Sequence, residues 1–158
     1  MTDLLSLLQE FYRDKLSAVL QHTADARVVS DYDANNTYQY IINREETELS
    51  WLAQAIVALG GEVPTAGSGQ GERSADDMRT VMERNGREAQ AFVDRWRPRV
   101  ESMSNARHRR MLNVILGEAL EQKRFFEQAL AGRHDLLGRR TEDVGPLVGK
   151  VLPTRWVE

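Results

Sequence analysis

The sequence contains no cysteine and no long apolar run. The absence of cysteine excludes disulfides, thiolate metal sites, iron–sulfur clusters and cysteine nucleophiles, so any metal ion would need oxygen or imidazole ligands. No apolar run approaches the ~18 residues of a membrane-spanning helix, and charged residues begin at Asp3. We therefore expect neither a signal peptide nor a membrane span, and we expect a cytoplasmic protein.

The chain also lacks an excess of charge of one sign. It carries 21 basic and 24 acidic residues spread along its length, for a net charge of −3. Nothing in this distribution indicates a surface built to attract nucleic acid, so we expect none to bind. With 158 residues, of which 41% are hydrophobic and 28% charged, the composition is that of one ordinary globular domain with one core.

Four amphipathic stretches predict an all-α protein. Each has apolar residues at helical spacing, and residues that favour helix ends stand beside it. The expected helices span residues 3–22, 33–59, 74–100 and 105–132. The connection between the second and third helices, residues 60–73, is rich in Gly and Ser and is longer than the turn that joins antiparallel neighbours. We therefore predict an antiparallel four-helix bundle with one crossover connection over residues 1–132.

Residues 133–158 form an apolar but irregular C-terminal tail. The tail contains several glycines and prolines among leucines, valines and Trp156, so it lacks helical spacing. Two interpretations stay open: the tail packs back over the bundle, or it docks a protein partner.

Acidic residues lie on the apolar faces of the expected helices. At about 100° per residue, Glu45 and Glu48 fall among the apolar residues of the second helix. Glu118 and Glu121 do the same in the fourth helix, and Glu88 lies near the apolar stripe of the third. A carboxylate inside a bundle is costly unless it is ion-paired, hydrogen-bonded, protonated or bound to a metal ion. The sequence therefore predicts a buried carboxylate cluster.

Other polar residues are expected at a similar depth. Lys15 lies beside the apolar stripe of the first helix, which brings a cation to the cluster, and Tyr12 lies in that stripe. Asn85 and Gln122 lie on the inward faces of the third and fourth helices. We expect these side chains to surround the carboxylates and to hydrogen-bond with them.

The two halves of the helical region match when the chain is shifted by 73 residues. The shift places the first helix on the third and the second helix on the fourth, with apolar residues on apolar residues. In the same register Glu45 meets Glu118 and Glu48 meets Glu121, so each half carries a Glu-x-x-Glu motif on its second helix. An ancestral duplication of one helical hairpin explains this pattern.

The motifs and the crossover resemble the ferritin-like superfamily, and rubrerythrin-like bundles in particular. Residues 44–64, REETELSWLAQAIVALGGEVP, are similar to the segment in which those proteins carry Glu-x-x-His-Leu and then Leu-Gly-Gly. The resemblance covers roughly residues 3–132. It implies that the second and fourth helices each supply Glu-x-x-His, that the first and third each supply a glutamate, and that these residues hold a pair of iron or manganese ions. By position, Glu45 and Glu118 match the motif glutamates, and Glu88 matches the glutamate of the third helix.

The sequence departs from that family in its ligands. Glu48 and Glu121 stand where the family has histidine, and Lys15 stands where the first helix would supply a glutamate. In one account, oxygen ligands alone hold iron or manganese, which would give oxidase, peroxidase or metal-storage activity. In the other, Lys15 supplies the positive charge, the metal site is vestigial or weakly occupied, and the protein has a binding or scaffolding role. We favour the second account because an ammonium group repels a nearby metal cation. Whether the protein is an enzyme stays open in this account.

The three histidines are expected to take no part in this cluster. His22, His108 and His134 lie near helix ends or edges, and none follows a glutamate by three residues. We therefore expect solvated imidazoles rather than catalytic or metal-binding ones.

Aromatic residues on the flank of the second helix predict self-association. Tyr40 and Trp51 lie well away from the centre of its apolar face. A homodimer built on this flank would bury them, and the C-terminal tail is the alternative cover.

Overall fold

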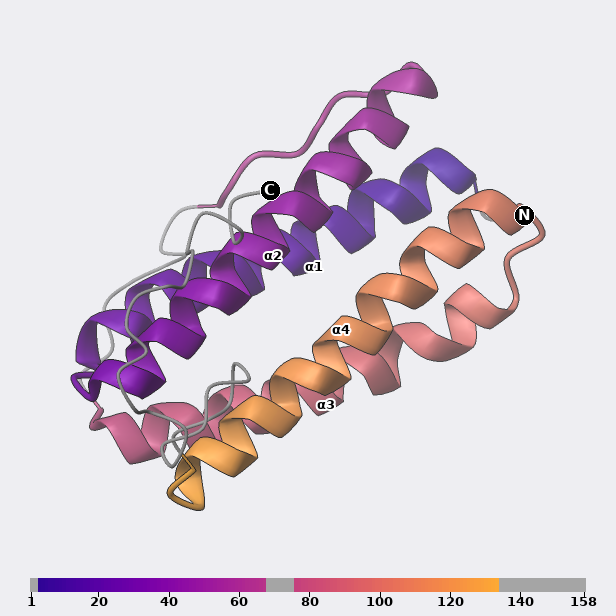
Figure 1. Cartoon of the computed structure of the whole chain (residues 1–158). Coiled ribbons are helices and arrows are strands. Elements are labelled where there is room, and N and C mark those ends of the chain that lie inside the picture. The colour runs from indigo at the N-terminus through magenta and orange to yellow at the C-terminus, as the bar shows by residue number, and fades with distance from the viewer. Residues whose placement is uncertain (1–2, 68–75, 134–158) are drawn as a thin grey trace, which may run out of the picture.

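The computed structural model describes residues 3–67 and 76–133, and within them the chain is helical with no strand. Its elements are α1 (Leu4–Asp25), the short 3-10 helix η1 (Ala26–Val28), α2 (Tyr32–Ala58), α3 (Met78–Glu101) and α4 (Ala106–Leu130). Figure 1 shows the four long helices side by side. The prediction of an all-α protein with four helices is confirmed. The C-terminal tail from residue 134 onward lies outside the described residues.

Each long helix begins with an acidic or amide side chain that caps its first turn. Asp3, Asp31, Asp77 and Asn105 each accept a hydrogen bond from a backbone N–H of the first turn that lacks a partner within the helix. The third helix therefore starts later than the expected residue 74, because Asp77 accepts from the backbone N–H of Thr80 at 2.9 Å.

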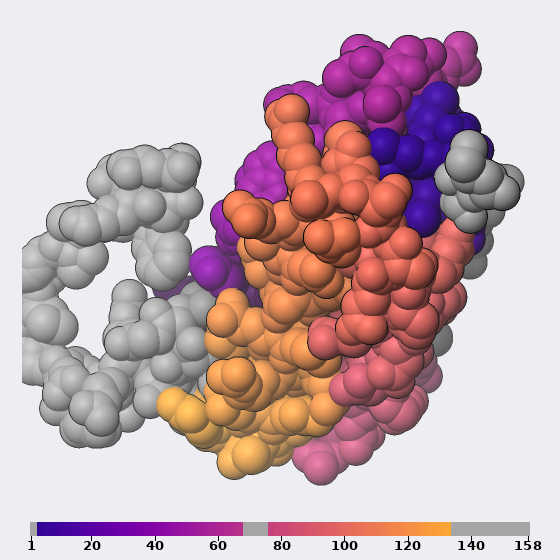
Figure 2. All heavy atoms as spheres, turned by 90° about the vertical axis from the view of Figure 1, so that its right-hand side faces the viewer, coloured from indigo at the N-terminus to yellow at the C-terminus, as the bar shows by residue number. Residues whose placement is uncertain are grey.

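The helices pack as two hairpins, α1 with α2 and α3 with α4. Ion pairs then join the hairpins: Arg99 lies 2.7 Å from Glu10, and Arg84 lies 3.0 Å from Asp25. The earlier of the two acidic residues on α1, Glu10, pairs with the later arginine on α3, and Asp25 pairs with the earlier one. These two helices are therefore antiparallel. Figure 2 shows α3 and α4 side by side along one face of the molecule.

The connection after α2 returns along the bundle. Since α1 is antiparallel to both α2 and α3, these two helices point the same way, and the segment between them has to join opposite ends of the bundle. Residues 59–67 begin this return in Figure 1. Gly60 ends α2 with a φ of 82°, a conformation that favours glycine. Gly61 then lies directly against the side chain of Leu5, where a Cβ atom would clash.

Two apolar cores fill the bundle. The larger core surrounds Phe11, Leu52 and Trp96, and the smaller one surrounds Tyr38 and Phe126. Along α2, α3 and α4, buried polar residues stand between the positions that contribute to the two cores, and His22 of α1 stands between Val19 of the larger core and Ala26 of η1 in the smaller one. The interior is therefore apolar at both ends and polar in the middle.

The aromatic flank of α2 is partly covered within the chain. Tyr40 contacts Phe125 of α4 edge-on at 6.0 Å between ring centroids, and the guanidinium of Arg44 lies over the ring of Trp51 at 5.7 Å. The homodimer stays a prediction. None of the described helices combines the length and apolar character needed to cross a bilayer.

Candidate functional site

The candidate site is the polar layer between the two cores, to which all four long helices contribute. We define the polar layer as six buried residues: Lys15, His22, Glu45, Glu48, Asn85 and Gln122. The hairpin α1–α2 supplies the charged and imidazole side chains, and the hairpin α3–α4 supplies the two amides. The layer is therefore chemically unequal in its two halves.

Lys15 is the central cation of the layer. Its side chain is 2% exposed, and its Nζ atom lies 3.1 Å from Glu45 Oε2 and 3.1 Å from Glu48 Oε1. Burial lowers the pKa of Lys15, but the charges of the two glutamates more than offset this effect and raise it overall. Lys15 is thus an ammonium group inside the bundle.

Glu45 is held as a carboxylate by two partners from α1. Its Oε1 atom lies 2.7 Å from His22 Nδ1, and its Oε2 atom faces Lys15. Burial raises the pKa of Glu45, but the interactions with His22 and Lys15 outweigh it, so the pKa is lowered. With a carboxylate as partner, Nδ1 of His22 carries the proton and donates it.

Glu48 differs from Glu45 although both are fully buried. Burial raises the pKa of Glu48 to about 8; Lys15 opposes this shift, and the neighbouring carboxyl group of Glu118 adds to it. Neither oxygen of Glu48 has an aligned hydrogen bond within the described residues. Glu48 is therefore protonated at neutral pH, which leaves Lys15 and Glu45 as the charged pair of the layer.

Glu118 contacts the layer from the flank. Arg44 donates two hydrogen bonds to it, from Nε at 3.0 Å and from Nη2 at 2.7 Å. Burial raises the pKa of Glu118, but its hydrogen bonds with Arg44 and the charges of Arg44 and Lys15 outweigh burial and lower the pKa. The side chains of Glu118 and Arg44 are both partly exposed, so this ion pair lies at the edge of the bundle and Arg44 balances the charge of Glu118.

Of the five carboxyls in the predicted cluster, Glu45 and Glu48 are buried and Glu118 is partly buried. Glu88 and Glu121 are exposed, so the expectation that all five carboxylates converge in the interior is wrong. Tyr12 is partly buried and packs against the larger core. Asn85 is buried as predicted, and its Nδ2 donates to the hydroxyl of Tyr38 at 2.7 Å rather than to a carboxylate.

The burial pattern fits an internal shift of 74 residues and not the predicted 73. The matched buried pairs include Leu8 with Met82, Val19 with Val93, Ile41 with Ile115, Ile42 with Leu116 and Leu52 with Phe126. One residue rotates a helix by about 100°, which moves Glu118 and Glu121 from the interior to the flank and the surface. Val114, which the 73-residue shift matches with the buried Ile41, is 45% exposed for the same reason.

His22 belongs to the polar layer, although the sequence did not predict it there. It was expected to be solvated, but it is 6% exposed and bonded to Glu45. A signal was present in the sequence: His22 follows Lys15 by seven residues, about two helical turns, so both lie on the same face of α1. An inward lysine therefore predicts an inward histidine.

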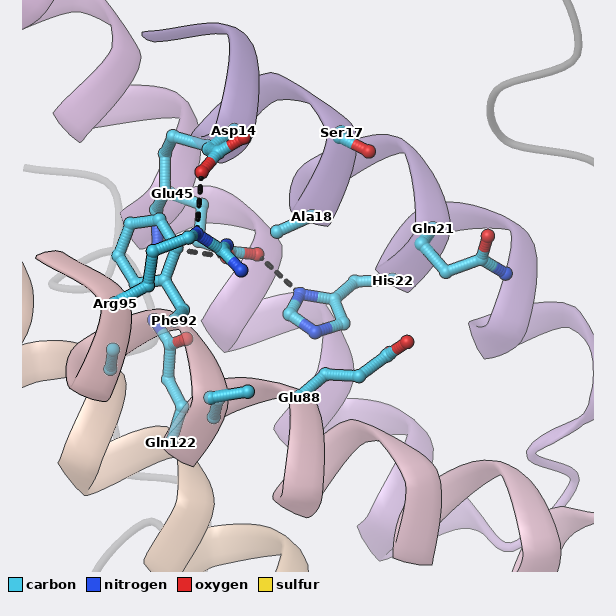
Figure 3. A pocket seen from close by; sticks show the side chains of 14 residues that line it. Asp14, Ser17, Ala18, Gln21, His22, Glu45, Glu88, Phe92, Arg95 and Gln122 are labelled. Atoms are coloured by element: carbon cyan, nitrogen blue, oxygen red, sulfur yellow. Dashed lines mark hydrogen bonds and ion pairs between the residues drawn. The ribbon is translucent and has the colours of Figure 1, made fainter. Parts of the chain in front are cut away.

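A cavity of about 280 Å³ opens from the polar layer between α1 and α3. Figure 3 shows the imidazole of His22 with Glu45 on one side and Glu88 on the other. Ala89 and Ala119 also line the cavity, where the 74-residue shift pairs them with Lys15 and Glu45. These two methyl side chains leave open the space that a larger residue would fill.

The residues of the layer do not fit a pair of metal ions. Within residues 3–67 and 76–133, no three His, Asp or Glu side chains come together as a metal-binding group. The ammonium of Lys15 stands between Glu45 and Glu48, the two carboxyls that the resemblance makes metal ligands. The carboxyls therefore have an internal cation.

Comparison with known proteins adds no relative. No protein-family model, no curated protein and no solved structure matches the chain. The function has to be inferred from the geometry of the site.

Proposed function

We propose that this chain is a ferritin-like bundle in which Lys15 takes the place of the metal, and that it acts as a metal-independent binding protein. The observation that carries the proposal is the position of Lys15 Nζ, 3.1 Å from a carboxylate oxygen of both Glu45 and Glu48. The same direction of α2 and α3, joined by a return segment, supports the crossover topology of that superfamily.

Electrostatics supports the loss of the metal. A cation bound by Glu45 and Glu48 would lie within a few ångströms of the ammonium, and at such distances like charges repel strongly in a dry interior. The site also offers only one imidazole, and that ring is turned with Nδ1 toward Glu45. Iron or manganese redox chemistry, the alternative function, has less support because Glu88 and Glu121 are exposed.

The cavity supports a binding role rather than a purely structural one. It reaches the polar layer, and a volume of about 280 Å³ is close to the lower end for small-molecule sites, about 300 Å³. Nine of its 14 lining residues are polar or charged and the others are four alanines and Phe92, so it is more polar than most small-molecule sites and suits a polar ligand.

Elemental analysis of the full chain, purified without chelator, tests the metal-independent role. We expect no stoichiometric iron, manganese or zinc, and no rise in melting temperature when ferrous, manganous or zinc ions are added. A content approaching two iron or manganese ions per chain would overturn the proposal and establish a dinuclear metal protein.

A matched pair of charge reversals sharpens this test. Lys15→Glu removes the internal cation and supplies the carboxylate that the resemblance implies, so we expect it to gain affinity for manganous ions. Lys123→Glu is the control, because Lys123 lies partly exposed on α4 and pairs with Glu127. Equal affinities in the two variants would show that Lys15 does not exclude metal.

A further inference from the structure

We propose that the cavity between α1 and α3 binds a small organic ammonium ion, which donates its hydrogen bonds to His22, Glu88 and Gln122. This inference rests on the proposed binding function and names the chemical class of the ligand. Three observations support it: an unpaired amide on the cavity wall, an imidazole nitrogen without a partner, and a carboxylate at the rim.

The first observation is the amide of Gln122. Gln122 is 5% exposed and lines the cavity, yet its side chain makes no hydrogen bond within the described residues. The amide atoms of Gln122 are not among the buried polar atoms that lack a partner, so they are accessible from the cavity, where a polar ligand can hydrogen-bond to them.

The second observation is the free edge of His22. Its Nδ1 atom is committed to Glu45 at 2.7 Å. In the neutral ring Nε2 then carries a lone pair and accepts hydrogen bonds. This nitrogen has no partner in the described part of the chain, and Figure 3 shows the far edge of the ring on the side of Glu88. The Glu45 carboxylate thus orients His22 as an acceptor toward the cavity.

The third observation is the charge of the lining. Arg95 Nε lies 3.0 Å from Asp14 Oδ2, so that pair is neutralised, as are Lys15 and Glu45. Glu88 has neither a hydrogen bond nor an ion pair among the described residues. Arg84, one helical turn before Glu88, is held by Asp25 and Asp76 and also attracts Glu88. The lining of the cavity has three acidic side chains, including Glu88, and two basic ones, Lys15 and Arg95, so its formal charge is −1 with His22 neutral.

These three groups suit an alkylammonium ion. An ammonium group has three N–H donors and no acceptor, and the cavity offers three acceptors in the Nε2 of His22, the carboxylate of Glu88 and the Oε1 of Gln122. The ring of Phe92 and the methyl groups of Ala89 and Ala119 provide apolar walls for a short alkyl chain. A carboxylate ligand would instead meet the negative charge of Glu88.

Three probes of similar size test the ligand class. The full chain is titrated with n-butylammonium, n-butanol or butyrate, and the imidazole signals of His22 and the side-chain amide signals of Gln122 are followed by NMR. We expect saturable shifts with n-butylammonium, with a dissociation constant of about 1 mM or lower, and at least tenfold weaker binding of the other two. Stronger or equal binding of butyrate or butanol would overturn the ammonium assignment while leaving a binding cavity. No shift with any probe would overturn the site.

Two matched substitutions separate the site from a surface effect. Glu88→Gln keeps size and exposure but removes the rim charge, so we expect at least tenfold weaker binding of n-butylammonium at an unchanged melting temperature. Glu121→Gln is the control, since Glu121 is exposed on α4 and does not line the cavity. Unchanged binding by the Glu88 variant would refute the inference. Elemental analysis tests the metal-independent role, and the NMR titrations test the ammonium site. A chain that contains no metal and does not bind n-butylammonium would refute the ammonium site alone.

Discussion

The two hairpins occupy equivalent positions in the bundle but contribute opposite properties to its centre. The 74-residue shift aligns the polar layer as Lys15 with Ala89, Glu45 with Ala119, and Glu48 with Gln122. The hairpin α1–α2 thus supplies charges that balance one another, whereas α3–α4 supplies small or neutral side chains. The first hairpin satisfies its own buried charges, and the second leaves space beside them.

This difference explains why the interior is both ionic and hollow. If positions 89 and 119 of the second hairpin also carried carboxylates, the bundle would need a bound cation to hold several carboxylates together. With alanines at 89 and 119, the charge of one hairpin is complete and a cavity forms against it. Substitutions in the two hairpins should therefore have unequal effects on stability.

Removing the internal cation should have the largest effect. Lys15→Met leaves Glu45 buried without its ammonium partner, and breaking a buried pair in this way costs about 3–5 kcal/mol. We expect that loss in the free energy of unfolding, measured by urea denaturation at neutral pH. Lys123→Met in the second hairpin should cost less than about 1 kcal/mol, because Lys123 pairs near the surface. Equal losses would erase the contrast between the hairpins.

The stability of the protein should fall as the pH rises, through Glu48. Its pKa is raised to about 8 in the folded protein, whereas an unfolded glutamate titrates near 4.5. Between these values the folded state holds a proton that the unfolded state has released, so the contribution is full below about pH 4.5 and is lost as the pH approaches 8. The slope is at most about 1.4 kcal/mol per pH unit.

Glu48→Gln isolates this dependence. The variant should lose the downward slope between pH 5 and 8, while Glu121→Gln, an exposed carboxyl of the second hairpin, should keep it. Urea denaturation across this pH range measures both. A wild-type slope that persists in Glu48→Gln would assign the titration to another group.

Substitution of His22 should reduce stability more than substitution of Arg95, the residue that the 73-residue shift matches with it. His22→Leu leaves Oε1 of Glu45 without its hydrogen-bond donor, which should cost about 1–3 kcal/mol. Arg95→Leu removes a half-exposed ion pair with Asp14 and should cost at most about 1 kcal/mol. Thermal unfolding of both variants checks the ranking, and a larger loss for Arg95→Leu would contradict the importance of the buried His22–Glu45 bond.

The smallest effect is expected at Glu118. Its pair with Arg44 is partly solvated, so Glu118→Gln should cost up to about 1 kcal/mol. Glu118 also raises the pKa of Glu48. In the Glu118→Gln variant the pKa of Glu48 should therefore be lower, and the pH-dependent loss of stability should occur at lower pH than in the wild type. A loss as large as that of Lys15→Met would place Glu118 in the interior after all.

The sequence predicted the helices, the polar character of the centre and the inward positions of Lys15, Glu45 and Glu48. These succeeded because helical periodicity is strong over more than twenty residues and glycines mark the end of α2. The predicted shift between the two halves was wrong by one residue. Adjacent apolar residues such as Val114 and Ile115 made it hard to tell from the sequence which of the two faces the interior of the bundle. The cavity had no sequence signal, since an alanine reveals open space only when the residues opposite it are known.

The division of the interior into two cores has a consequence for how the protein opens. The larger core holds 16 buried hydrophobic side chains of the described residues and the smaller core nine. Apolar burial supplies most of the resistance to local unfolding, and the polar layer interrupts its continuity. Backbone amides around Tyr38 and Phe126 should therefore exchange with solvent deuterium through partial openings, while those around Leu52 and Trp96 exchange only when the whole bundle unfolds.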